Sequence, residues 1–191
     1  MNKPTISDMK SVYDKHQNLK LAAVELNMKW QTLYWNLKEY KHPVVGNKEK
    51  YGSTTDKLAR YTEKLFHKTI PFAKDLNDEQ FQAKSDFDIK GTKVDIKSST
   101  KKDSNKRALS KNHSFRWAFS CKVQESTDVD FIICYCYTGY DATDFGEVEK
   151  ILLIPSEFFK NMQSISVSCR KSKWFDFEVT ESELKDFFKT L

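Results

Sequence analysis

The residues with the clearest chemical potential lie in the stretch 85–99, which reads SDFDIKGTKVDIKSS. Apolar and charged residues alternate on both sides of a Lys-Gly pair, a pattern typical of two short antiparallel strands joined by a tight turn. With a two-residue loop, Asp86 faces Asp95 across this hairpin. Opposed carboxylates repel each other unless a positive charge lies between them, and such oxygen ligands suit a hard divalent cation such as Mg²⁺. Lys97 then projects beside the ion, where it can orient or activate an attacking water.

The alternation also assigns the side chains of the hairpin to two faces, because successive side chains in a strand point to opposite sides. The charged face holds Asp86, Asp88, Lys93, Asp95 and Lys97, and the apolar face holds Phe87, Ile89, Val94 and Ile96. The apolar face predicts core packing, whereas the charged face predicts either a chemical site or a solvated sheet surface. An acid-x-Lys tripeptide alone does not decide between these, since five occur in the chain. Only the tripeptide 95–97 has another acid across a hairpin.

On these residues the stretch resembles the active-site hairpin of the PD-(D/E)XK nuclease superfamily, which has the restriction-endonuclease-like fold. In that pattern an Asp opens the first strand and an acid-x-Lys ends the second, often followed by Ser or Thr, as Ser98 and Ser99 follow here. The resemblance implies that Asp86 and Asp95 are metal ligands and that Lys97 is the catalytic lysine. The implied cofactor is Mg²⁺, with Mn²⁺ able to substitute.

Three further positions bear on this resemblance. Ser85 stands where the pattern has a proline, and Asp88 is an alternative first acid because it would take over if the turn were longer or bulged. The superfamily often places an acid on the first helix of the core, and Glu63 lies in a helix predicted over 53–67. An ordinary solvated glutamate is the alternative for Glu63. The inward face of that helix is predicted to hold Leu58, Tyr61, Thr62 and Leu65.

Residues 5–40 carry the pattern of a helix-turn-helix, with helices predicted over 7–16, 19–26 and 29–40. Amides can read base edges, lysines can meet phosphates, and aromatics can pack on sugars or methyl groups. The third helix is therefore predicted to present a DNA-binding face made of Lys29, Trp30, Gln31, Thr32, Tyr34, Asn36 and Lys38. A small helical bundle for protein contacts is the alternative.

A second basic region follows the hairpin directly, over 101–116. It contains Lys101, Lys102, Lys106, Arg107, Lys111 and Arg116 against a single acid, Asp103, so its net charge equals the +5 of the whole chain. A basic segment beside a metal site would lie against phosphates and strengthen binding through counterion release. A solvated basic loop without a partner is the alternative.

The element pattern predicts an α/β fold in two parts. Residues 1–42 form a small all-α helix-turn-helix domain, 43–52 form a linker containing Pro43 and two glycines, and 53–191 form the nuclease domain. The nuclease domain is predicted as a restriction-endonuclease-like core, a mixed central sheet flanked by helices. Further strands are predicted over 115–123, 129–137 and 151–154. A closing hairpin is predicted to pair 165–169 with 174–179. A terminal helix follows, and it begins at a capping box over 180–183.

The chain has four cysteines without C-x-x-C spacing, no signal-peptide pattern and no apolar run long enough to cross a membrane. These features predict a reduced, cytoplasmic protein associated with DNA rather than with a membrane. Cys134 and Cys136 are expected to point to one side of a strand as buried free thiols, in preference to a zinc site.

These observations predict a Mg²⁺-dependent endonuclease that hydrolyses double-stranded DNA, of the sequence-specific restriction or homing type. A homodimer or higher homo-oligomer is expected, because both strands must be cut. One alternative is a Holliday-junction resolvase or repair nuclease, which has less need for a base-reading helix. Another is a non-catalytic DNA-binding regulator with an inactive nuclease fold.

Overall fold

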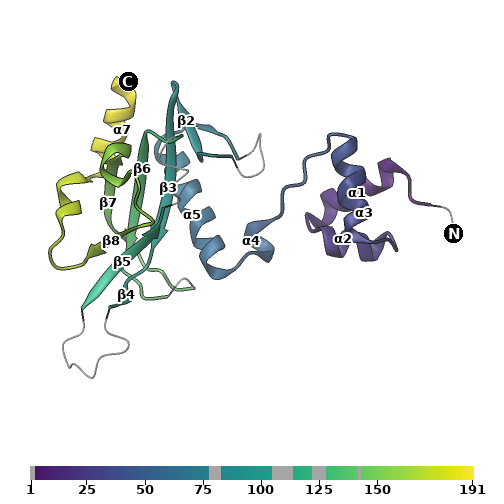
Figure 1. The fold of residues 1–191 in the computed structure, drawn as a ribbon, viewed down its shortest axis with the longest axis horizontal. Helices are drawn as coiled ribbons and strands as arrows, with labels where there is room; N and C mark the ends of the chain where they lie inside the picture. The colour runs from purple at the N-terminus through teal and green to yellow at the C-terminus, as the bar shows by residue number, and fades with distance from the viewer. Residues whose placement is uncertain (1–2, 78–82, 105–113, 122–127, 142) are drawn as a thin grey trace. The chain divides into compact units, whose positions relative to one another are not determined.

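A computed structural model describes residues 3–77, 83–104, 114–121, 128–141 and 143–191. The chain divides into two compact units, Met1–Ser53 and Thr54–Leu191, each with its own apolar core. Figure 1 shows the first unit in purple to blue and the second in blue through yellow. No helix in the described ranges is long and apolar enough to cross a bilayer.

The first unit is built from helices α1 (Ile6–His16), α2 (Leu19–Glu25), α3 (Trp30–Glu39) and the short α4 (Lys48–Tyr51). The first three lie within one residue of their predicted bounds. Thr5 opens α1 with a capping box shared with Asp8, and the side chain of Asn18 caps α2. The two adjacent alanines of α2 are buried, and their small side chains let the helices pack closely. The buried apolar core comprises Met9, Tyr13, Ala22, Ala23, Leu33 and Leu37.

A six-stranded mixed sheet forms the centre of the second unit, in the order β1-β2-β3-β6-β7-β9. Its strands are β1 (Lys74–Asp75), β2 (Phe87–Ile89), β3 (Thr92–Ser99), β6 (Phe131–Tyr137), β7 (Val148–Pro155) and β9 (Glu178–Val179). β3 and β6 run parallel, and the other neighbours are antiparallel. The strand predicted over 129–137 corresponds to β6, which lies between β3 and β7, and its nearly all-apolar composition suits this central position. The unit is therefore mixed α/β, with a mixed sheet and helices.

A three-stranded antiparallel sheet covers one face of this central sheet. It contains β4 (Lys102–Asp103), β5 (Phe115–Ser120) and β8 (Ser164–Ser168), in the order β4-β5-β8. The core between the two sheets includes Trp117 and Phe119 of β5 and Cys134 of β6. Helices α5 (Thr54–Thr69) and α7 (Glu181–Thr190) contribute Phe66 and Phe188 to the core on the opposite face. A short α6 (Ser156–Phe159) follows β7.

The predicted closing hairpin is wrong. Strand β8 pairs with β5, and residues Lys173–Phe177 form a 3₁₀ helix before β9, which pairs with β7. The Ser172 side chain accepts a hydrogen bond from the Trp174 amide at the start of this turn. Trp174 is buried in the core between the sheets, so tertiary packing overrides the strand preference of this aromatic segment.

One inward residue of α5 was also predicted wrongly. Tyr61 is 49% exposed, whereas Leu58, Thr62 and Phe66 are buried. These three residues recur every four positions, so they lie on one stripe of the helix that faces the sheet. Tyr61 lies beside that stripe, and its ring packs at a tilt against Phe145, with 4.8 Å between the ring centroids.

Candidate functional site

The hairpin of β2 and β3 has the predicted turn and register. Lys90 and Gly91 form the loop with φ values of 52° and 93°, the left-handed conformation that two-residue hairpin turns require. The register partners are Phe87 with Val94, Asp88 with Lys93 and Ile89 with Thr92. These three predicted pairs are confirmed, and Asp86 lies directly before β2 rather than in a ladder pair with Asp95.

The two faces of the hairpin separate as predicted. All four apolar residues of one face, Phe87, Ile89, Val94 and Ile96, lie in the core beneath α5. Asp95 and Lys97 are the register partners of Ile132 and Cys134 on β6. Those two partners belong to the core beneath the second sheet. Because register partners in neighbouring strands share a face, Asp95 and Lys97 project toward the second sheet.

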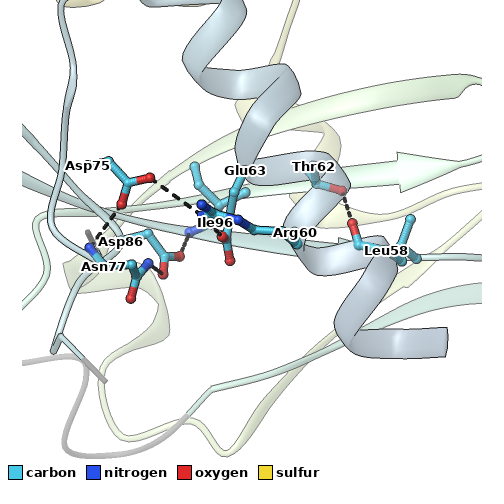
Figure 2. Close-up of polar contacts among 8 residues, drawn as sticks. All are labelled: Leu58, Arg60, Thr62, Glu63, Asp75, Asn77, Asp86 and Ile96. Carbon is cyan, nitrogen blue, oxygen red and sulfur yellow. Dashed lines mark hydrogen bonds and ion pairs between the residues drawn. The ribbon is translucent and has the colours of Figure 1, made fainter. Parts of the chain in front are cut away.

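Asp86 is held against strand β3 by backbone and side-chain hydrogen bonds. Its amide donates to the Val94 carbonyl at 2.9 Å, and its Oδ2 accepts from the Ile96 amide at 2.7 Å. Its Oδ1 accepts from Nδ2 of Asn77 at 3.0 Å. Figure 2 shows the Asp86 carboxylate between Asn77 and Ile96. The carboxylate therefore lies beside the peptide that joins Asp95 to Ile96.

Asp95 and Lys97 form an ion pair on the same strand. Lys97 Nζ lies 2.8 Å from Asp95 Oδ2, and the two side chains are 22% and 8% exposed. A charge pair in so dry a place is screened weakly by solvent, so each group strongly affects the other. Behind the pair, Ser99 Oγ accepts from the Ala118 amide at 3.1 Å and ties β3 to β5. The acid-x-Lys segment is thus fixed from both sides.

The alternative first acid, Asp88, has a different environment near the tip of the hairpin. It ion-pairs with its register partner Lys93 and accepts a hydrogen bond from the Gly91 amide at 2.8 Å. The Lys93 ammonium, followed by the Gly91 amide, lowers the pKa of Asp88 below its ordinary value. Asp86, in contrast, contacts the strand at the residue next to Asp95. The geometry therefore favours Asp86 over Asp88 as the partner of Asp95.

Glu63 of α5 is buried, at 8% exposure, and pairs with a cation of its own helix. Its Oε2 lies 3.0 Å from Arg60 Nη1, which also lies 3.5 Å from Asp75 Oδ2. Figure 2 shows Arg60 between these two acids. Helix α5 packs on the face of Val94 and Ile96, the opposite one from Asp95. The structure thus gives Glu63 a protein cation as partner.

The donor set can be tested against a divalent ion. Within the described ranges, no group of three or more His, Cys, Asp or Glu residues gathers closely enough to hold a metal. Asp86 accepts a hydrogen bond from the Ile96 amide, and Asp95 is the residue directly before that amide in the chain. Mg²⁺ usually keeps several waters and takes one or two carboxylates together with substrate phosphate. The pair fits that mode of binding and does not fit an all-protein metal cage.

The predicted DNA-binding face of α3 is largely exposed. Lys29, Trp30, Gln31, Thr32 and Lys38 are exposed, while Tyr34 and Asn36 are half-buried. Sequence reasoning missed Trp35, which is 70% exposed and stacks edgewise on Tyr34. The signal was present, because the residue midway between the buried Leu33 and Leu37 points away from the core.

The charge of the first unit supports an anionic partner. Residues 1–53 contain nine lysines and five acids, a net charge of +4 out of the chain's +5. Three of the acids are engaged away from α3: Asp8 in the cap of α1, Asp14 with His42, and Glu25 with Lys15 and His16. The lysines of α3 are therefore opposed mainly by Glu39 on that helix.

Only part of the second basic region can be described. Lys106, Arg107 and Lys111 lie outside the described residues. Lys101 lies 2.5 Å from Glu149 and over the Trp117 ring, and the Glu149 carboxylate raises the pKa of Lys101. Lys101 is thus engaged within the unit rather than held out toward a ligand.

Lys102 and Arg116 present a different arrangement from Lys101. Both are exposed, and they are register partners on β4 and β5. Arg116 Nη1 also donates to Ser166 Oγ at 3.3 Å. Directly opposed like charges are unfavourable unless an anion lies nearby, so the pair suits a phosphate.

The four cysteines are free. Cys134 and Cys136 point to the same side of β6 and are buried between the two sheets, as expected. Burial raises the pKa of both thiols, which keeps them protonated. Their surroundings are those of core residues.

No protein-family model and no curated protein matches this sequence. Among solved structures, a bacterial homing endonuclease aligns with 76% of this chain and with 96% of its own chain. The sequence identity is 16% and the TM-score is 0.39. So loose a likeness carries no statement about the activity of this chain.

Proposed function

We propose that this protein is a metal-dependent DNA endonuclease of the PD-(D/E)XK type with an N-terminal helix-turn-helix. The observation that carries the proposal is the register of the β2–β3 hairpin. It brings the Asp86 carboxylate to 2.7 Å from the Ile96 amide, while Lys97 Nζ lies 2.8 Å from Asp95 Oδ2. The Asp86 carboxylate thus lies beside the strand segment that carries the Asp95–Lys97 pair, an arrangement that supports phosphodiester hydrolysis with a divalent ion.

Each residue of this segment has a role in the proposal. Asp86 and Asp95 would hold Mg²⁺ together with the scissile phosphate. The ion, when bound, polarises the phosphate and lowers the pKa of a bound water. The Lys97 ammonium would orient the attacking water and stabilise the charge that develops on the phosphate oxygens. Glu63 has no ligand role in the proposal, because it pairs with Arg60 and its helix packs on the sheet face opposite Asp95. The superfamily resemblance implies 5′-phosphate and 3′-hydroxyl products.

Two surfaces would bind the DNA. The exposed face of α3 would enter a groove, with amides and aromatics against bases and lysines against phosphates. Lys102 and Arg116 would bind backbone phosphate beside the catalytic hairpin. A homodimer or higher homo-oligomer would supply a second site for the second strand.

The deciding experiment is cleavage of a long duplex of known sequence with the full chain and Mg²⁺. Discrete ends are expected, and Asp86→Ala, Asp95→Ala and Lys97→Ala should each abolish them while DNA binding persists. Asp88→Ala is the matched control and should still cut, because Asp88 pairs with Lys93 at the hairpin tip.

Two other outcomes would replace the proposal. Cleavage of four-way junctions without cleavage of linear duplex would indicate a junction resolvase. Binding without cleavage of any duplex or branched substrate would indicate a regulator with an inactive nuclease fold.

A further inference from the structure

Asn77 joins the acid of the hairpin to helix α5 through a short polar chain. Its side-chain amide donates to Asp86 Oδ1 at 3.0 Å. Its backbone amide donates to Asp75 Oδ1 at 2.9 Å, and Asp75 Oδ2 lies 3.5 Å from Arg60 Nη1. Arg60 in turn lies 3.0 Å from Glu63. Figure 2 shows this series of contacts, which runs from Arg60 on α5 through Asp75 and Asn77 to Asp86.

The backbone around Asn77 is held at two points, so its side chain has a defined direction. Asp75 bonds the amide two residues ahead, which is an Asx turn. The Leu76 amide donates to the Asp86 carbonyl at 2.9 Å and brings the two segments together. Asp75 is itself mostly buried and paired with Arg60. The donor on Asn77 therefore faces the Asp86 carboxylate before any ligand arrives.

The effect on Asp86 follows from its two hydrogen bonds. Asn77 bonds one carboxylate oxygen and the Ile96 amide bonds the other. Because the two donors lie on different segments, the carboxylate cannot rotate without breaking one bond. A carboxylate has about four lone-pair sites, so each oxygen keeps acceptor capacity for an ion.

We propose that Asn77 is a positioning residue that orients the Asp86 carboxylate for a divalent ion. This inference rests on the proposed function, since it assigns a partner to one of the two acids of that site. Hydrogen-bond partners that orient a metal ligand raise metal affinity, and removing one typically weakens binding about 10- to 100-fold. Asn77 was not distinguished by sequence, because it precedes Asp86 by nine positions and carries no motif.

The test measures Mn²⁺ binding to the full chain without DNA, by titration calorimetry or by the electron-paramagnetic-resonance signal of free Mn²⁺. Asn77→Ala and Asn77→Leu should both weaken Mn²⁺ binding at least tenfold. The leucine variant keeps the side-chain volume and lacks the donor, so it separates hydrogen bonding from packing. Thermal unfolding midpoints show that each variant is folded.

The matched control is Asn47→Ala. Asn47 also donates its side-chain amide to a side-chain oxygen, that of Gln17 at 2.9 Å, but it lies in the first unit. The Asn47→Ala protein should bind Mn²⁺ with the affinity of the unsubstituted protein. Equal losses in the Asn47 and Asn77 variants would overturn the inference.

The remaining outcomes distinguish the inference from the proposed function. If Asp86→Ala abolishes Mn²⁺ binding and both Asn77 variants bind normally, the inference fails and the metal site stands. If only Asn77→Ala is impaired, packing is responsible and the inference fails. If the unsubstituted protein does not bind Mn²⁺, or Asp86→Ala leaves binding unchanged, the proposed metal site and the inference fail together.

Discussion

The Ile96 amide donates a 2.7 Å hydrogen bond to Oδ2 of Asp86. This bond links the acid before β2 to the strand segment that carries Asp95 and Lys97, and it spans ten positions of the chain. The proposed chemistry depends on it, because the bond fixes the Asp86 carboxylate beside the segment of Asp95 and Lys97.

Replacing Lys97 by methionine should lower the single-turnover cleavage rate by at least about 100-fold, the range typical for a group that assists proton transfer or charge development. Lys93→Met is the matched control, because Lys93 lies on the same strand as Lys97 but pairs with Asp88 near the hairpin turn. DNA affinity, followed by fluorescence anisotropy, should change little in either variant. Equal rates in the two variants would contradict the role of Lys97.

Tyr135 and Tyr137 offer a matched test of hydrogen bonding in the core. Both are 1% exposed, but the Tyr137 hydroxyl lies 3.0 Å from Thr62 Oγ1, whereas that of Tyr135 has no hydrogen-bond partner in the described part of the chain. Tyr135→Phe should raise the free energy of unfolding by about 1 kcal/mol, and Tyr137→Phe should lower it by about 1 kcal/mol. Urea denaturation measures both changes. If both variants changed the free energy of unfolding by a similar amount in the same direction, the two hydroxyls would have equivalent surroundings and the prediction would be wrong.

Asp88 should make stability depend on pH in acid. Lys93, and then the Gly91 amide, lower the pKa of Asp88 below its ordinary value of 3.8. A carboxyl whose pKa is lower in the folded state stabilises the protein above its unfolded pKa, and this contribution is lost as pH falls through the folded pKa. The stability difference between the unsubstituted protein and Asp88→Asn should therefore be constant near neutrality and shrink below about pH 4. Urea titrations between pH 2 and pH 7 would show it, and a difference that grows in acid would contradict it.

Trp35 should contribute to DNA binding without supporting the fold, because it is 70% exposed on the side of α3 away from the core. Trp35→Ala should weaken binding of duplex DNA about tenfold or more, as for an aromatic anchor in an interface. Val24→Ala on α2, at 78% exposure, is the control and should bind normally. Unchanged affinity in both variants would place the DNA contact elsewhere than on α3.

Much of the site could be predicted from local pattern. A two-residue turn at Lys90 and Gly91 determines the register of the whole hairpin, and strict alternation then determines the faces of Asp95 and Lys97. The outward face of α3 follows from the spacing of Leu33 and Leu37 in the same way. These features repeat every two or every 3.6 residues, so they are properties of the chain itself.

The partners of these residues could not be predicted, because they come from distant segments. Strand β8 pairs with β5 across about fifty positions, and Lys101 meets Glu149 across nearly as many. The contact of Asn77 with Asp86 depends on the pairing of β1 with β2, which brings the two segments together. Glu63 was predicted beside a metal, and the structure places Arg60 against it.

The sequence by itself therefore determined the hairpin, its register and the chemical types on each face, since neighbouring residues dictate backbone period and turn geometry. The tertiary structure decided which donors hold Asp86, which cation meets Glu63 and where Lys101 points. These contacts depend on how whole helices and sheets pack against each other. Burial and charge pairing are satisfied for the unit as a whole, so no local sequence pattern encodes them.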